Sequence, residues 1–224
     1  MTRTRYAGEL ESVRQNLIAM GETTIALLSE ALCAVAEPNP GCAEKASELE
    51  AQTDHQHRLI HDQCLNLITL QSPVARDARL ITGALDAIVD LELIGDYAYE
   101  MVGLSSAKLG RLPSQILNQI SEIGAKIAEI LSAAIDSWRR EDRGMALEAR
   151  PREAAIRAQC KALAEKVSLL TSAPGDVTVY VNLLLICRHL ERIMRHAVCV
   201  AERAAEAAPA DAPWTSRNVS VGVG

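Results

Sequence analysis

Short groups of helix-breaking residues divide this chain into long segments, and within each segment the apolar residues recur with helical spacing. The breaks fall at PNPG (38–41), SPV (72–74), GRLP (110–113), EDRG (141–144) and TSAPG (171–175), and at AAPADAP from residue 207. Strand patterns are almost absent. Helices of this length pack most readily side by side in an elongated bundle. The sequence therefore predicts an all-α fold, an elongated array of six long helices.

The composition agrees with a helix bundle and limits the function. Only 3% of the 224 residues are aromatic and none is Phe, which is typical of cores built from small and aliphatic side chains. The net charge of −6 disfavours nucleic-acid binding, which depends on neutralising phosphates. No apolar run reaches the roughly 18 residues of a membrane span. We expect a cytoplasmic protein that reaches a membrane only through a partner, without insertion.

Two pairs of segments indicate an internal duplication. DLELIGDYAYE (90–100) aligns with HLERIMRHAVC (189–199) at an offset of 99 residues. ELEAQTDH (48–55) aligns with ALEARPRE (146–153) at an offset of 98. Two matches at nearly one offset predict two tandem three-helix bundles, residues 1–109 and 110–207. The remainder, 208–224, loses helical periodicity and is predicted to be a disordered tail.

Each repeat carries two charged pairs with a spacing of four residues, which places both members of a pair on one helix face. The pairs of the first repeat contain only acids, whereas each pair of the second joins an acid to a base. They are Glu50 with Asp54, Glu92 with Asp96, Glu148 with Arg152, and Glu191 with Arg195. Because helices joined by a short turn run antiparallel, the two pairs of each repeat are expected to lie level across their hairpin.

The four acids of the first repeat predict a metal site. Carboxylates at one level of a helix seam repel one another unless protons or a cation neutralise them, and hard cations prefer oxygen ligands. We therefore predict that Glu50, Asp54, Glu92 and Asp96 bind one or more divalent or trivalent ions, such as Mg, Mn, Fe or Zn. His57 is a candidate additional ligand, and His61 lies one turn further away. The alternative interpretation is that these acids are solvated and the histidines partly buried beside them.

The corresponding positions of the second repeat predict a site that needs no ion. Glu148 is expected level with Arg195, and Arg152 level with Glu191. The local charge then sums to zero, so the two guanidinium groups replace the cation.

The remaining chemistry of the sequence argues against an enzyme. It contains no nucleophile-elbow or P-loop motif, and no E-x-x-H of the kind that di-iron bundles need. The cysteines form no C-x-x-C pair, and we interpret all of them as small buried residues of a reducing cytosol. They are Cys33, Cys42, Cys64, Cys160, Cys187 and Cys199.

Three stretches also resemble the motifs of the PhoU family of phosphate-uptake regulators. They are CLNLITLQSPVARDAR (64–79), LELIGDYA (91–98) and LERIMRHAVCVAE (190–202). The resemblance extends over about residues 5–207 and implies an all-α double bundle that binds metal clusters through E-x-x-x-D motifs. Those motifs carry over to the first repeat only, because Arg152 and Arg195 stand where the second would need acids.

The resemblance also implies partners. A member of this family is expected to act as a negative regulator on a phosphate ABC transporter and a sensor histidine kinase, and a homodimer is expected. Asp77 and Arg79, in the best-matched motif, are candidate partner contacts, although a helix-start acid and a surface base would look the same. Two other interpretations stay open: a di-iron-like metal protein, and a structural interaction bundle unrelated to phosphate.

Overall fold

The chain forms seven helices in the computed structural model, which describes residues 3–37, 39–71, 73–105, 114–170 and 177–209. They are α1 (Arg3–Ala36), α2 (Pro40–Gln71), α3 (Ala75–Leu104), α4 (Ser114–Arg140), α5 (Arg143–Leu147), α6 (Arg150–Leu170) and α7 (Val177–Ala207). Within these ranges no strand occurs, so the all-α prediction is confirmed. The predicted boundary at 109/110, and the predicted tail from residue 210 onward, lie outside the described residues.

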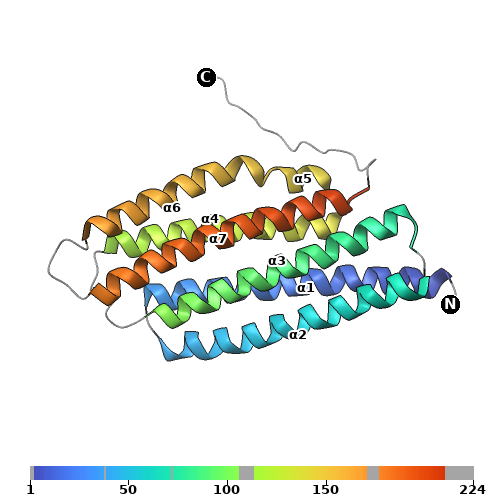
Figure 1. Cartoon of the computed structure of the whole chain (residues 1–224), viewed down its shortest axis with the longest axis horizontal. Helices are drawn as coiled ribbons and strands as arrows, with labels where there is room; N and C mark the ends of the chain where they lie inside the picture. The colour runs from blue at the N-terminus through green and yellow to red at the C-terminus, as the bar shows by residue number, and fades with distance from the viewer. Residues whose placement is uncertain (1–2, 38, 72, 106–113, 171–176, 210–224) are drawn as a thin grey trace, which may run out of the picture.

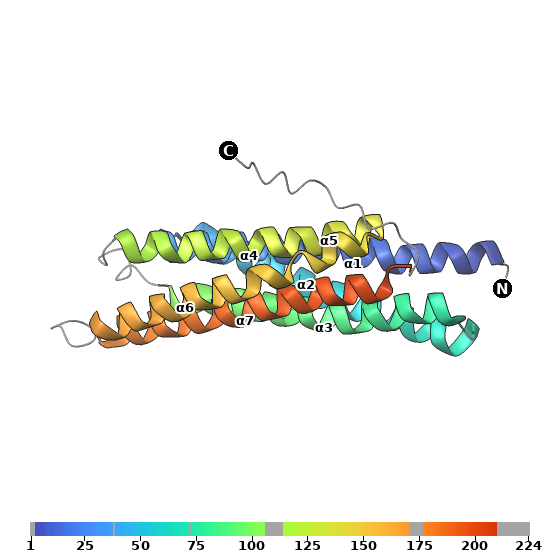
Figure 2. The same cartoon turned by 90° about the horizontal axis from the view of Figure 1, so that it is seen from above.

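The helices run along one long axis, with α1–α3 on one side and α4–α7 on the other (Figure 1). Figure 2 shows how the two groups meet, with α4 beside α1 and α7 beside α3. Helices α1, α3, α4 and α7 therefore make a central four-helix core. Helix α2 flanks it against α1 and α3, and α6 flanks it against α7 and α4. The elongated array of two three-helix units is confirmed, and its units lie side by side.

The contacts between α3 and α7 follow the internal repeat. The Nδ1 atom of His196 lies 2.8 Å from Oδ1 of Asp90, and the ring of Tyr97 stacks on His189 with centroids 5.6 Å apart. At the offset of 99 residues, Asp90 corresponds to His189 and Tyr97 to His196. Each repeat thus presents the same two positions to the other, as an approximate two-fold arrangement requires.

Helices α1 and α4 approach each other closely at two glycines. A Cβ atom on Gly21 would lie 2.1 Å from Cδ1 of Ile135, and one on Gly124 would lie 2.4 Å from Cδ2 of Leu32. Each glycine therefore accommodates a branched side chain of the opposite helix. The two contacts are equivalent in the repeats, since Gly124 lies 103 residues after Gly21 and Ile135 lies 103 residues after Leu32.

The fourth helix ends where the EDRG break was predicted. Glu141 adopts a positive φ of 53°, and its carboxylate accepts hydrogen bonds from Arg14 at 2.6 Å and Arg76 at 3.2 Å. Asp142 then caps α5 by accepting a hydrogen bond from the backbone N–H of Gly144 at 2.9 Å. The helix predicted after this break is divided, because a turn at residues 148 and 149 separates α5 from α6.

Helix α1 corrects one sequence expectation. It contains a window, within Thr4–Ala36, with a mean hydropathy of 1.5, long and apolar enough to cross a membrane. However, 56% of that window is buried inside the bundle, because α1 is one of the four central helices. A helix buried in the core of a bundle can have the same length and hydropathy as a membrane span.

The cysteine prediction holds for four of the six residues. Cys42, Cys64, Cys160 and Cys187 are buried. Cys199 is partly exposed, and Cys33, near the C-terminal end of α1, is exposed. The prediction of a buried side chain is therefore wrong for Cys33.

Candidate metal centre

Three of the predicted ligands come together between α2 and α3. Carboxylate oxygens of Glu50 and Asp54, from α2, and of Asp96, from α3, all lie within 4.8 Å of one another. Gly95, next to Asp96, faces α2, where a Cβ atom added to it would make an ordinary contact with Cγ2 of Thr53 at 3.5 Å.

The electrostatics of this carboxylate cluster (Glu50, Asp54 and Asp96) favour a proton or a cation. The pKa of Glu50 is raised, first by burial and then by the charge of Asp54. The pKa of Asp96 is also raised, first by burial and then by Glu92, Asp54, Glu50 and, last, Glu100. Both groups therefore have a cost of ionisation that a bound cation would offset.

The fourth predicted ligand lies at the edge of the cluster. Glu92 turns toward His57, with Oε2 3.6 Å from Nε2, yet its charge still contributes to the raised pKa of Asp96. The ring of His61 is 6.4 Å from that of His57, and its Nδ1 lies 3.5 Å from Asp62. His57 is thus placed near a potential ligand, whereas His61 pairs with Asp62, which is not part of the cluster.

The donor set fits a hard cation. Three carboxylates from two helices supply only oxygen ligands, and the partly exposed position leaves room for water to complete the coordination. One base lies nearby: Nη1 of Arg58 is 3.8 Å from Oδ2 of Asp54. A single exposed guanidinium at that distance balances only part of the negative charge.

The second repeat does not form the predicted pairs. Among the ion pairs of the described residues, Nη1 of Arg152 lies 3.7 Å from Oε2 of Glu129, and Glu191 accepts from Arg188 at 2.6 Å. Glu148 is exposed and caps the C-terminal end of α5, outside α6. The turn at residues 148 and 149 interrupts the helix on which Glu148 and Arg152 were expected to share a face. The prediction of mutual compensation is therefore wrong in its geometry.

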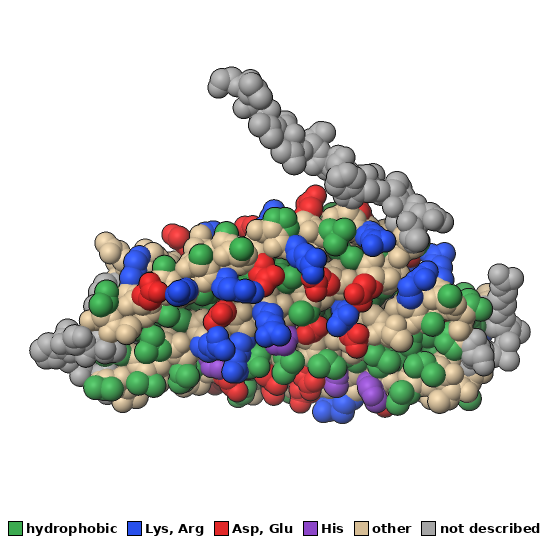
Figure 3. Space-filling view, turned by 45° about the horizontal axis from the view of Figure 1, so that its top comes forward, with side chains coloured by type: hydrophobic (Ala, Val, Ile, Leu, Met, Phe, Trp, Pro, Cys, Tyr) green, Lys and Arg blue, Asp and Glu red, His purple; other side chains and the backbone are tan. Residues whose placement is uncertain are grey.

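Instead, the second repeat presents a basic groove, which the sequence patterns did not reveal. Arg192 lies over the ring of Tyr97, 5.2 Å from its centroid, so the groove joins both repeats. Figure 3 shows basic side chains gathered near the middle of one face. The groove is lined by Tyr97, Arg157, Arg188, Glu191, Arg192, Arg195 and His196.

The predicted partner-contact residues lie at the start of α3. Arg79 is exposed, whereas Asp77 is partly buried in the first turn. Burial and then Asp77 raise the pKa of the Tyr6 hydroxyl of α1, so Asp77 faces the bundle. Arg79 is thus the better placed of the two for contact with another molecule.

The raised pKa values of Glu50 and Asp96 predict how the stability of the metal-free protein depends on pH. The stabilisation linked to these groups is complete below their usual pKa values of 4.5 and 3.8, and is lost as pH rises through the raised values. In chelator, the unfolding free energy of Asp96→Asn should therefore fall less than that of the parent as pH rises above these usual pKa values. Urea titrations across pH will measure it, with the exposed Asp62→Asn as control. An unchanged pH profile in Asp96→Asn would contradict the prediction.

Comparison with known proteins identifies relatives along most of the chain. Two ranges, residues 17–104 and 120–204, match the PhoU domain family. The chain is 28% identical over 201 residues to the phosphate-specific transport system accessory protein PhoU homolog of Pseudomonas aeruginosa, covering 88% of this chain and 83% of that protein. It is 27% identical over 202 residues to the homolog of the same name from Synechocystis sp., covering 90% of each.

Solved structures share the fold. The crystal structure of PhoU from Pseudomonas aeruginosa superposes with a TM-score of 0.81 at 25% identity, covering 89% of this chain and 96% of that one. The phosphate transport system regulatory protein PhoU from Streptococcus pneumoniae has a TM-score of 0.80 at 20% identity, covering 93% and 99%. The second likeness concerns the fold alone.

Proposed function

The chain belongs to the PhoU family, and from that premise we propose that it is a metal-binding regulatory accessory protein of phosphate transport. The observation that carries the proposal is the family match through both repeats, including the helices that hold the carboxylate cluster. The relatives that span most of the chain are named as accessory proteins of a phosphate-specific transport system. The protein acts in this proposal by binding other proteins, without catalysis.

A bound cation would give the α2–α3 hairpin its regulatory state. Oxygen-only ligands favour Mg²⁺ or Mn²⁺, while Fe or Zn would be helped by His57 beside Glu92. A bound ion would be shared by Glu50, Asp54 and Asp96 and would hold α2 and α3 together. Without the ion, the three carboxylates repel one another across the two helices. The basic groove on the second repeat gives no equivalent site, so metal binding is assigned to the first repeat.

The proposed partners are a phosphate ABC transporter and a sensor histidine kinase, both acted on negatively from the cytoplasm by a homodimer. The turn between α2 and α3 offers a surface for such contacts. Leu70 and Val74 there are 73% and 68% exposed, although both are apolar, and Arg79 adds a positive charge. Apolar side chains exposed together with a base are typical of a protein interface.

Binding to membranes is therefore expected to depend on the transporter. The protein should co-sediment with membranes that contain the transporter and not with protein-free liposomes. Leu70→Ser combined with Arg79→Glu should reduce that co-sedimentation at least about tenfold, as loss of more than about 1.4 kcal/mol of interface energy would. The matched control is Leu169→Ser, which replaces an equally exposed leucine on α6. Equal binding to liposomes, or equal loss in the control, would contradict the proposal.

A further inference from the structure

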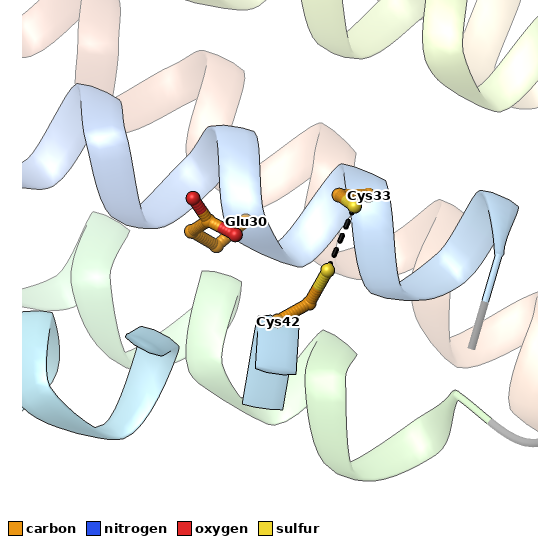
Figure 4. Close-up of side chains that lie close together, drawn as sticks. All are labelled: Glu30, Cys33 and Cys42. Carbon is orange, nitrogen blue, oxygen red and sulfur yellow. Dashed lines mark hydrogen bonds between the residues drawn. The ribbon is translucent and has the colours of Figure 1, made fainter. Parts of the chain in front are cut away.

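Three potential ligands meet at the turn between α1 and α2, and two of them are cysteines, which the carboxylate cluster lacks. The Sγ atoms of Cys33 and Cys42 lie 2.8 Å apart, and a carboxylate oxygen of Glu30 lies within 4.8 Å of both (Figure 4). Cys33 is exposed and Cys42 is buried. An ion can therefore reach the group from solvent while one ligand is held by the core.

The local structure fixes this arrangement. Glu30 and Cys33 are three residues apart, so they share one face of α1 near its C-terminal end at Ala36. Helix α2 begins at Pro40, and the side chain of Asn39 accepts a hydrogen bond from the Gly41 N–H at 2.9 Å. The short turn thus places the first turn of α2, which carries Cys42, against the last turns of α1.

We propose that Glu30, Cys33 and Cys42 bind a thiophilic divalent cation, with Zn²⁺ as the preferred ion. Two thiolates and one carboxylate are a ligand set that zinc accepts, and the fourth position stays open to water or to a ligand from another molecule. Tetrahedral Zn–S bonds of about 2.3 Å place two sulfurs roughly 3.8 Å apart. The sulfurs must therefore separate by about 1 Å, and the exposed Cys33 side chain is free to make that movement.

The charges of the group support an ion that replaces protons. Lys45 donates a hydrogen bond to the Glu30 carboxylate, and these two opposite charges cancel. The group of Glu30, Lys45, Cys33 and Cys42 is therefore neutral when both cysteines are thiols. Two thiolates add two negative charges, and Zn²⁺ balances them while two protons pass to water.

Zinc titration of the reduced protein, purified without an affinity tag, tests the proposal directly. A competing chromophoric chelator measures the affinity, and Co²⁺ in place of zinc should give thiolate-to-cobalt charge-transfer absorption. Cys42→Ser and Cys33→Ser should each weaken zinc binding at least about 100-fold, because even partners outside the ligand shell contribute roughly 10–100-fold. Because Cys33 is exposed, Cys33→Ser should fold like the parent. Circular dichroism will check the folding of both variants.

Two controls separate this site from the rest of the protein. Cys199→Ser, which alters a partly exposed cysteine of α7, should bind zinc like the parent. Asp54→Asn with Asp96→Asn should leave the thiolate-to-cobalt absorption unchanged, so the proposal does not depend on the carboxylate cluster or on phosphate regulation. It is overturned if cobalt gives no thiolate absorption, or if Cys42→Ser binds zinc like Cys199→Ser. It is also overturned if the reduced protein binds no zinc and Cys33 and Cys42 only form a disulfide in air.

Discussion

Replacing both Asp54 and Asp96 by Asn should stabilise the metal-free protein and abolish its stabilisation by Mn²⁺ or Mg²⁺. The change keeps the size of both side chains but removes two of the three charges that repel each other in the cluster. A cation present at about 100 times its dissociation constant should add ~2.7 kcal/mol to the parent. In a chain of this size that corresponds to a rise of roughly 5–11 °C in melting temperature. The variant should show no such rise.

Thermal melts with chelator and with added metal will measure both effects, and elemental analysis will give the metal bound per chain. The matched control is Glu44→Gln with Asp62→Asn, which removes two exposed acids from α2 outside the cluster. It should keep the response of the parent to metal. If the Asp54 and Asp96 variant binds as much metal as the parent, these acids are solvated surface groups and metal binding must be withdrawn from the proposed function.

The proximity of Glu50 and Asp96 could be predicted because helices leave little freedom. A spacing of four residues fixes a face, and an antiparallel hairpin fixes the level, so two residues equidistant from the turn must approach each other. The orientation of Glu92 toward His57 could not be predicted in the same way. It depends on the rotamers of two long side chains, both of which could reach several neighbours.

The geometry of the second repeat was missed although the sequence contained its signal. Pro151 lies in the segment that was aligned with α2, and proline is favoured in the first turn of a helix and excluded from its interior. Helix α6 indeed begins at Arg150, one residue earlier. Reading the segment as a continuous helix placed Glu148 and Arg152 on a common face that the turn before Arg150 removes.

The packing of the two repeats on each other was also not predicted. The offsets of 98 and 99 came from the acid pairs, whereas the contact between α1 and α4 repeats at 103. At that offset Gly21 matches Gly124, and Leu32 matches Ile135. Helical periodicity predicts an apolar face, but it does not identify which other helix covers it. Gly21 and Gly124 mark the contact between α1 and α4, because each leaves room for a branched side chain of the opposite helix.

Gly21→Val is consequently expected to be among the most destabilising single substitutions in the chain. Its Cβ would lie 2.1 Å from Cδ1 and 2.5 Å from Cγ1 of Ile135, whose side chain is only 2% exposed. Overpacking of this kind costs about 3 kcal/mol or more, which exceeds the few tenths that Val gains over Gly in helix propensity. Urea unfolding will measure the loss. Gly8→Val, on the same helix with no heavy atom within 4 Å of the added Cβ, should be nearly neutral.

A second change across the α1–α4 contact distinguishes overpacking from a general intolerance of α1. Ile135→Ala alone should cost about 2–5 kcal/mol, because it leaves a cavity beside Gly21. In the double variant, the valine side chain introduced by Gly21→Val fills the space that the Ile135 side chain leaves. The destabilisation caused by each single change should therefore be partly offset by the other. We expect the double variant to be more stable than the sum of the single changes predicts by about 1–3 kcal/mol. Additive losses would mean that Gly21 and Ile135 do not meet, and that the repeats pack in another register.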